Sequence, residues 1–206
     1  RSLDDHLAIF LKACDAVAHA HSRGIVHLEL KPENIQVGDF GDVLVCDWET
    51  ACAIDDAPFR DLQFVNGTLG FIAPEQTELR TGVVDERTDV YALSAILYAI
   101  LCGSPPLDGA CLSDMLADVR TSNFPRPSEK LPREGIPSAL EAVAMKGLAA
   151  DPDQRYQTVE ELKYEIERFR GGFATLAEDA GFSQQLRLLI DRNRGVCALI
   201  AIILIV

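Results

Sequence analysis

The stretch His27-Leu28-Glu29-Leu30-Lys31-Pro32-Glu33-Asn34 decides the fold of this chain. Asp47-Trp48-Glu49 begins thirteen residues after this stretch ends, and Ala73-Pro74-Glu75 follows further along. Two later motifs complete the series, Asp89-Val90-Tyr91-Ala92-Leu93 and Asp151-Pro152-Asp153-Gln154-Arg155-Tyr156. The order and spacing of the series, more than any single motif, predict the fold.

The series resembles the motifs of protein kinases, and its first stretch is similar to their catalytic loop. That loop has the pattern His-Arg-Asp-Leu, followed by three residues and Asn. In this chain the ends of the pattern are kept as His27 and Asn34. However, Leu28 stands in place of the Arg and Glu29 in place of the Asp. Lys31, two residues after the catalytic position, is typical of the Ser/Thr branch of the family.

The later motifs agree with this resemblance. Asp47-Trp48-Glu49 stands where kinases have Asp-Phe-Gly, and Ala73-Pro74-Glu75 matches their Ala-Pro-Glu motif. Gly67-Thr68-Leu69-Gly70-Phe71-Ile72 is similar to the substrate-docking loop of Ser/Thr kinases. Trp48 in place of Phe, and the tail Gly171-Gly172-Phe173-Ala174-Thr175, resemble bacterial receptor-type kinases.

The resemblance implies a mainly α (α+β) fold, the helical C-terminal lobe of the protein kinase fold, over residues 1–170. Short β-like runs at residues 35–37 and 43–46 predict a β-hairpin beside the catalytic loop. Only 26 residues precede that loop, and no Gly-x-Gly-x-x-Gly motif occurs in the sequence. We therefore expect an excerpt of a longer protein, without the N-terminal lobe of the fold.

Local signals predict where the helices lie. Ser2, Ser138 and Thr158 are each followed three residues later by an acidic residue, a pattern that predicts capping boxes at helix starts. Residues 88–102 are apolar on nearly every side, which predicts a buried central helix. Residues 124–137 contain four prolines and are expected to form a loop.

The resemblance also implies roles for individual residues. Glu29 would accept the proton of the substrate hydroxyl, and Lys31 would contact the transferred phosphate of ATP. Asn34 and Asp47 would hold the Mg²⁺ ions that accompany ATP, and Thr68 would belong to the substrate loop. Four further residues are expected to have structural roles, with an ion pair between the second and the last: His27, Glu75, Asp89 and Arg155.

Three substitutions bear on whether catalysis survives. The extra methylene of Glu29 moves the carboxylate by roughly 1 Å, and a misplacement of that size costs about a hundredfold in rate. Leu28 replaces an Arg that in many kinases pairs with a phosphorylated activation segment, so we expect no switching by phosphorylation there. Glu49 replaces a Gly whose backbone freedom lets the preceding Asp reach the metal.

Two functions therefore remain open. The first is a Ser/Thr protein kinase that transfers phosphate from ATP to protein hydroxyls at an impaired rate. The second is a pseudokinase, a signalling module that binds nucleotide or partner proteins. The excerpt by itself is expected to be inactive, because the lobe that covers ATP is missing from it.

Composition sets further limits. A chain of 206 residues with 48% hydrophobic residues fits one domain with extensions. The net charge of −13 argues against nucleic acid as a partner, because phosphate backbones are bound by Lys and Arg clusters. The six cysteines show no Cys-x-x-Cys spacing, so we expect them to be reduced and mostly buried in a cytosolic domain.

The C-terminal part has a different character. Residues 171–195 are expected to form a linker and a juxtamembrane helix. Residues 196–206 are eleven apolar residues without a charge, fewer than the roughly 20 that span a membrane. We expect the first part of a transmembrane helix here; a short buried strand or helix is the alternative.

Basic residues support the membrane interpretation. Arg187, Arg192 and Arg194 precede the apolar run, as is typical of the cytoplasmic side of a membrane helix. We therefore expect a protein of the cell membrane, with its kinase-like domain on the cytoplasmic side. Its expected partners are a protein substrate or a signalling protein.

Overall fold

The computed structural model describes residues 1–54, 69–77, 84–107, 112–178 and 181–193. This part of the chain is mainly helical and also contains two small pairs of strands. The predicted fold class, mainly α with a β component, is confirmed. The helices and strands are α1 Leu3–His21, β1 Ile25–Val26, β2 Ile35–Val37, β3 Val43–Val45, β4 Cys52–Ala53, α2 Glu86–Cys102, α3 Leu112–Thr121, α4 Pro127–Lys130, α5 Ser138–Gly147, α6 Val159–Arg170 and α7 Phe182–Arg192.

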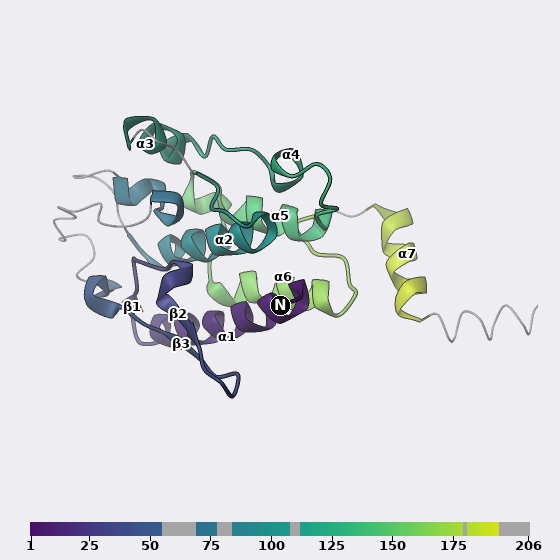
Figure 1. Cartoon of the computed structure of the whole chain (residues 1–206), viewed down its shortest axis with the longest axis horizontal. Coiled ribbons are helices and arrows are strands. Elements are labelled where there is room, and N and C mark those ends of the chain that lie inside the picture. Colours follow the sequence, from purple (N-terminus) through teal and green to yellow (C-terminus); the bar gives the residue numbers. More distant parts are fainter. Residues whose placement is uncertain (55–68, 78–83, 108–111, 179–180, 194–206) are drawn as a thin grey trace, which may run out of the picture.

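Helix α2 is the centre of the molecule. It lies between α5 on one side and α1 on the other in Figure 1, and α6 also packs against it. Asp85 caps its start in a capping box with Thr88, and Gly103 ends it in the left-handed conformation, with a φ of 71°. The predicted buried helix is therefore present and begins two residues earlier than expected, because Asp85 supplies the cap.

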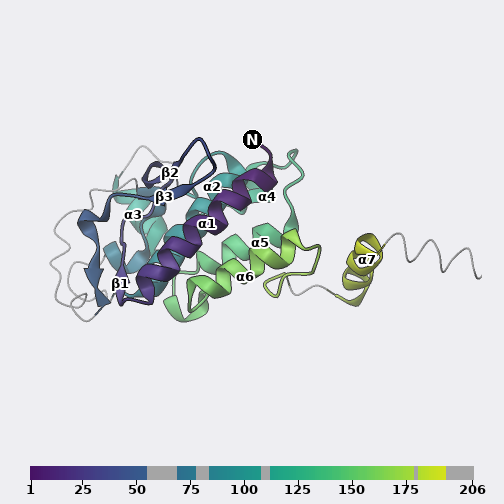
Figure 2. The same ribbon diagram turned by 90° about the horizontal axis from the view of Figure 1, so that it is seen from below.

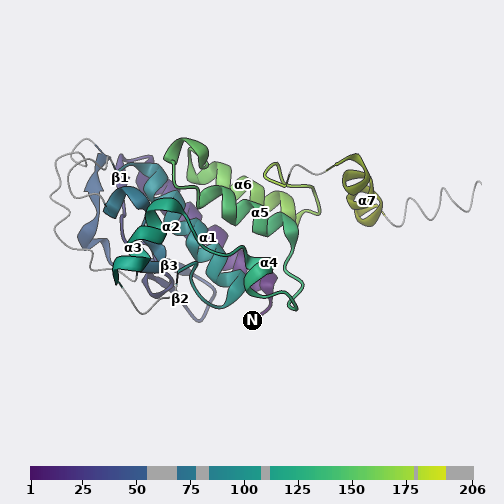
Figure 3. The same cartoon turned by 90° about the horizontal axis from the view of Figure 1, so that it is seen from above.

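The apolar sides of α1, α5 and α6 close the core around α2. Figure 2 shows α1 beside α6, and Figure 3 shows α5 beside α6. Two ion pairs also join α1 to α6 at the surface, Lys163 to Asp15 at 2.6 Å and Arg170 to Asp4 at 2.8 Å. The largest fully buried side chains are Leu7, Phe10, His27, Leu30, Tyr91, Leu93, Leu97, Tyr98, Leu140, Leu148, Leu162 and Ile166.

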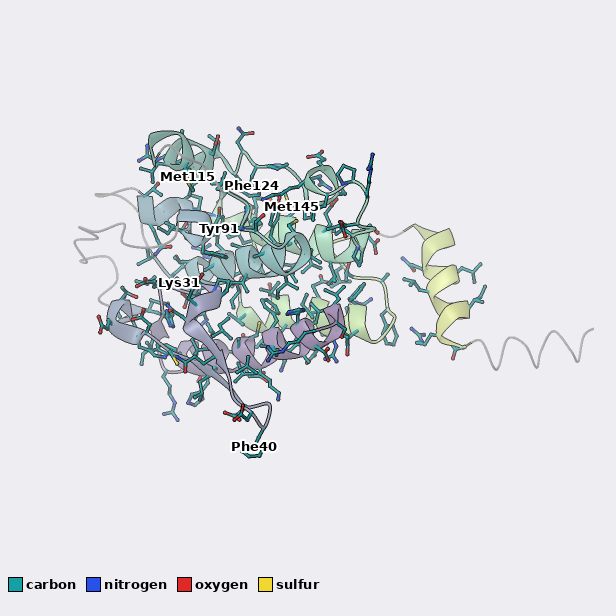
Figure 4. All side chains as sticks on the ribbon, viewed as in Figure 1. Lys31, Phe40, Tyr91, Met115, Phe124 and Met145 are labelled. Atoms are coloured by element: carbon teal, nitrogen blue, oxygen red, sulfur yellow. The ribbon has the colours of Figure 1, made fainter. Side chains whose placement is uncertain are left out.

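The strands form two separate antiparallel pairs. β2 pairs with β3 in the predicted hairpin, with Ile35 opposite Val45, and β1 pairs with β4. The hairpin turn carries Phe40, which is fully exposed and points away from the body of the protein (Figure 4). The hairpin thus follows the predicted catalytic loop directly and leads the chain back to Asp47.

Several local predictions were wrong or incomplete. Ser138 does not cap α5; its hydroxyl donates to Glu178, and Pro137 holds the cap position. Thr158 caps α6 as expected, but Glu161 bonds the backbone N–H of Gln157 instead of closing the box.

Other corrections concern segments and the cysteines. The proline-rich loop contains the short helix α4, which begins at a proline, where a missing N–H costs nothing. The first part of the predicted linker is not free but packed against α6: the Leu176 N–H donates to buried Glu165, and Thr175 is buried. Residues 173–176 of this packed segment are called the strap. Of the four described cysteines only Cys14 is fully buried, and its burial raises the pKa of the thiol.

Helix α7 lies within the segment for which a juxtamembrane helix was predicted, and its position next to a membrane stays a prediction. Among the described residues, no helix has the length and apolar character needed to cross a membrane. The predictions for Thr68 and for residues 196–206 lie outside the described part of the chain.

The predicted ion pair between Glu75 and Arg155 is present and buried. The Arg155 guanidinium donates to both Glu75 oxygens at 2.8 Å, and its remaining donors reach backbone carbonyls of Arg87, Ala149 and Ala150. Thr88 donates to the same carboxylate. This network ties the segment before α2 to the turn between α5 and α6.

We expect Glu75→Ala to lower the free energy of unfolding by about 3–5 kcal/mol, because it leaves the Arg155 guanidinium buried without its carboxylate. Denaturation in urea measures the change. Lys163→Ala, which removes the partly exposed partner of the exposed Asp15, is the matched control and should cost about 0–1 kcal/mol. A loss at Glu75 no larger than at Lys163 would contradict a structural role for the buried pair.

Candidate active site

The predicted catalytic loop is held by the start of α2. The Asp89 carboxylate, which has no solvent exposure, accepts the backbone N–H of His27 at 2.8 Å and that of Leu28 at 2.9 Å. It also accepts a hydrogen bond from Nε2 of His21, the last residue of α1, at 2.8 Å. One carboxylate therefore fixes the loop to two helices.

The His27 ring serves this loop as a brace. Its Nδ1 accepts the Glu29 N–H at 3.3 Å, so its Nε2 carries the hydrogen that it donates to the Cys46 carbonyl at 3.0 Å. The ring also lies 4.4 Å from that of Trp48. Both ring nitrogens are engaged and the side chain is buried, which supports the structural role expected for His27.

Glu29 and Lys31 form a direct pair. The Lys31 Nζ lies 2.6 Å from the Glu29 Oε1, and each side chain keeps a little under a fifth of its surface exposed. The hydrogen bond to Glu29 raises the pKa of Lys31, and the negative charges of Asp47 and Glu33 add to this effect. The predicted catalytic loop therefore presents the Glu29 carboxylate and a stably charged Lys31 ammonium side by side. Figure 4 shows Lys31 at the opposite end of the hairpin from Phe40.

Asn34 and Asp47 offer oxygen ligands beside this pair. The Asn34 side chain is buried and donates its Nδ2 hydrogen to the Glu29 carbonyl at 2.8 Å, while its Oδ1 receives no hydrogen bond from the described residues. The Cys46 N–H donates to the Asn34 carbonyl at 2.8 Å, which ties the residue before Asp47 to the loop. Asp47 is exposed and holds a left-handed backbone, with a φ of 65°.

These two residues fit Mg²⁺ in its usual protein setting. Mg²⁺ prefers oxygen ligands and is commonly held by one or two side chains together with phosphates. Within the described ranges, no group of three or more His, Cys, Asp or Glu side chains could hold a metal without such help. A left-handed backbone at a residue with a Cβ costs on the order of 1–2 kcal/mol, and such strain tends to occur at functional sites.

The two other substituted positions behave differently from each other. Leu28 also has a left-handed backbone, with a φ of 67°, and its side chain packs against Val26 and Val84 in a small apolar cluster. Glu49 is exposed in a 3₁₀ turn formed by Trp48–Thr50, and the left-handed position is Asp47 instead.

Four supporting contacts were not predicted from the sequence. His21 was expected only as a surface or helix-packing residue, yet it binds Asp89. Thr50 donates to the His27 carbonyl, Gln76 donates to the Leu28 carbonyl, and Trp48 donates to Val45. Each contact joins residues far apart in sequence or uses a backbone carbonyl, so no local pattern signals it.

We expect Asp89→Ala to speed hydrogen exchange at the amides of His27 and Leu28, because both buried N–H groups lose their acceptor. Exchange measured by NMR should rise at these amides far more than at amides within α6. Asp15→Ala, an exposed carboxylate on α1, serves as the control. Unchanged protection of the two amides in Asp89→Ala would show that the loop does not depend on this carboxylate.

Comparisons with known proteins support the motif-based interpretation. The family model of the protein kinase domain matches residues 2–165. The serine/threonine-protein kinase PknD of Chlamydia felis is 38% identical over 188 residues, which cover 83% of this chain and 20% of that protein. PknD of Protochlamydia amoebophila is 33% identical over 183 residues, covering 81% of this chain and 18% of the relative.

The serine/threonine-protein kinase PknB of Mycobacterium leprae is 38% identical over 168 residues, covering 81% of this chain and 26% of that protein. The chain thus spans about a fifth to a quarter of the length of these relatives. The family match extends over most of the chain and includes the loop, the hairpin and the central helix described above. The chain therefore belongs to the protein kinase family, and within it to the bacterial serine/threonine kinases.

Proposed function

We propose that the protein containing this chain transfers phosphate from ATP to Ser or Thr hydroxyls of proteins, at a rate limited by Glu29. The observation that carries this proposal is the contact between the Glu29 carboxylate and the Lys31 ammonium at 2.6 Å. Phosphoryl transfer needs a proton acceptor for the attacking hydroxyl and positive charge near the phosphate. In this proposal the pair would supply both.

Glu29 would take the proton. A general base must come within about 2.6–3.2 Å of the proton donor, and the partly exposed carboxylate can be reached by a substrate hydroxyl. The backbone of the loop is fixed by Asp89, so the longer side chain cannot be compensated by a shift of the loop. Reduced rather than absent catalysis follows from this combination.

Lys31, Asn34 and Asp47 would serve ATP and its Mg²⁺. When bound, Mg²⁺ supplies positive charge that neutralises the phosphates during transfer. The free Oδ1 of Asn34 and the exposed Asp47 carboxylate are the oxygens suited to hold it. Thr68 remains the proposed contact with the protein substrate.

Two features favour the second candidate, a pseudokinase that signals by binding nucleotide or partner proteins. Glu49 places an additional exposed carboxylate two residues after Asp47, where phosphates would have to approach. Leu28 holds an apolar cluster at the position of an expected arginine. These features oppose rapid catalysis but leave a scaffold that can bind.

Leu28 also supports a proposal about regulation. Its packing against Val26 and Val84 joins the catalytic loop to the residue two before α2 begins. These buried apolar contacts fix the position of the loop without a phosphorylated residue in the activation segment. Activity of this domain would then not require phosphorylation between residues 47 and 75.

The test uses the full-length protein with ATP and Mg²⁺, and a Ser/Thr peptide library as phosphate acceptor. We expect slow transfer by the wild type, and a loss of about 10²–10⁴-fold in Glu29→Ala, because a positioned base contributes about that much. Glu29→Asp should raise the rate by up to about a hundredfold, since it restores the shorter reach.

Glu33→Ala is the matched control, since it removes an exposed carboxylate from the same loop and should leave the rate within about twofold of wild type. Transfer unaffected by Glu29→Ala would contradict the role of Glu29. No transfer by the wild type, together with measurable nucleotide binding, would establish the pseudokinase candidate instead.

We further propose that residues 196–206 begin a membrane anchor, which would place the kinase-like domain at the cytoplasmic side of the cell membrane. The apolar run and the preceding arginines support this. In the full-length protein, Ile203→Arg should move a large share of the protein out of the membrane fraction, because an arginine in the middle of a span costs about 2.5–3.5 kcal/mol. Ile203→Leu is the control. An unchanged membrane fraction in Ile203→Arg would contradict the anchor.

A further inference from the structure

A hollow separate from the candidate active site lies between the end of α6, the strap at residues 173–176, and α7. It has a volume of about 390 Å³, within the range of small-molecule and lipid-sized pockets. Helix α7 stands at the end of the molecule away from the strand pairs in all three ribbon views (Figures 1–3). The lining combines leucines, one aromatic ring and two arginines. It includes Arg168, Phe173, Thr175, Leu176, Leu189 and Arg192.

Exposed apolar side chains gather at this hollow. Of the ten large hydrophobic side chains that are exposed in the described part of the chain, four line the hollow, and a fifth, Ile190, follows Leu189 on α7. Their exposed fractions run from 43% at Leu186 to 66% at Leu176, with Phe173, Leu189 and Ile190 in between. Spacings of three and one residues place Leu186, Leu189 and Ile190 along one stripe of α7. A folded protein seldom leaves such a cluster uncovered.

Two guanidinium groups stand over the same ring. The Arg192 Cζ lies 3.9 Å from the centre of the Phe173 ring, and the Arg168 Cζ lies 5.9 Å from it. Within the described residues neither arginine forms an ion pair with a carboxylate. The chain as a whole has a net charge of −13, so arginines without acidic partners stand out against an acidic background.

The hollow also holds a hydroxyl without a partner. Thr175 is only 3% exposed, and its Oγ1 has no hydrogen bond within the described structure. A buried polar atom normally has a partner, so this atom favours a ligand that carries an oxygen. Leucines, arginines and a free hydroxyl together suit a ligand that is apolar at one end and anionic at the other.

We propose that this surface, the α7 patch (Arg168, Phe173, Leu176, Leu186, Leu189 and Arg192), docks on an anionic phospholipid bilayer. The leucines and Phe173 would enter the boundary between headgroups and acyl chains, and the arginines would contact lipid phosphates. The sequence after α7 favours a bilayer over a soluble partner, because residues 196–206 are apolar throughout. The acidic remainder of the chain is repelled by such a surface, so the patch sets which side of the domain faces the membrane.

This proposal adds to the membrane anchor above, and the experiment separates the two. The apolar run at residues 196–206 would bind vesicles of any headgroup charge, whereas the α7 patch adds a preference for anionic lipid. Co-sedimentation of the chain with phosphatidylcholine vesicles measures the first effect. The gain in affinity when phosphatidylglycerol is included measures the second.

We expect tighter binding to the anionic vesicles, and a gain that falls as salt is raised. Arg192→Gln should weaken binding to anionic vesicles by about fivefold and leave binding to neutral vesicles unchanged, which is the size expected for one basic residue near such a surface. Leu189→Ser should weaken binding to anionic vesicles several-fold through lost apolar burial.

Arg133→Gln and Leu44→Ser are matched controls, because both residues are exposed and lie outside the α7 patch. Equal binding of the wild type to both kinds of vesicle would overturn the proposal. So would an Arg192→Gln variant that binds as Arg133→Gln does. A dimer in vesicle-free solution that Leu189→Ser dissociates would assign the patch to a contact between two copies and would also overturn it.

Discussion

The Asp89 carboxylate is the constraint on which the rest of this structure depends. It lies at the start of the buried helix α2 and accepts hydrogen bonds from two consecutive backbone amides of the loop and from His21 of α1. A buried carboxylate is stable only when such donors surround it. Because α2 is itself fixed in the core between α1, α5 and α6, the position of the loop is set by the core and not by the surface. The buried pair of Glu75 and Arg155 is bonded to Thr88 and to the Arg87 carbonyl, so it joins the start of the same helix to the turn before α6.

Short hydrogen bonds within the loop connect the candidate site residues on this frame. Asn34 donates to the backbone carbonyl of Glu29, and Lys31 donates to the Glu29 carboxylate. Leu28 is buried in an apolar cluster, and Glu49 lies exposed in a short turn. Under the proposed function, activity depends on how far the Glu29 carboxylate reaches.

The sequence predicted the fold, because kinase motifs have a fixed order and spacing, while the roles of the candidate site residues stay predictions. The hairpin at residues 35–45, the central helix and the pair of Glu75 with Arg155 are all present. The errors arose where a local signal competed with distant partners. Ser138 matched a capping pattern but bonds Glu178, and the expected linker packs against α6 through Glu165. The role of His21 was missed because its partner lies 68 residues away in the sequence.

The central claim is that Glu29 acts as the proton acceptor of the proposed site, with Asn34 and Asp47 as its metal ligands. A crystal structure of the full-length protein with Mg²⁺, a non-hydrolysable ATP analogue and a serine peptide would test it most directly. The account predicts a Glu29 oxygen within about 2.6–3.2 Å of the serine hydroxyl, with Asn34 Oδ1 and the Asp47 carboxylate on the metal. A Glu29 carboxylate that stays bonded to Lys31 and out of reach of the hydroxyl, or a metal bound without Asn34 and Asp47, would contradict it.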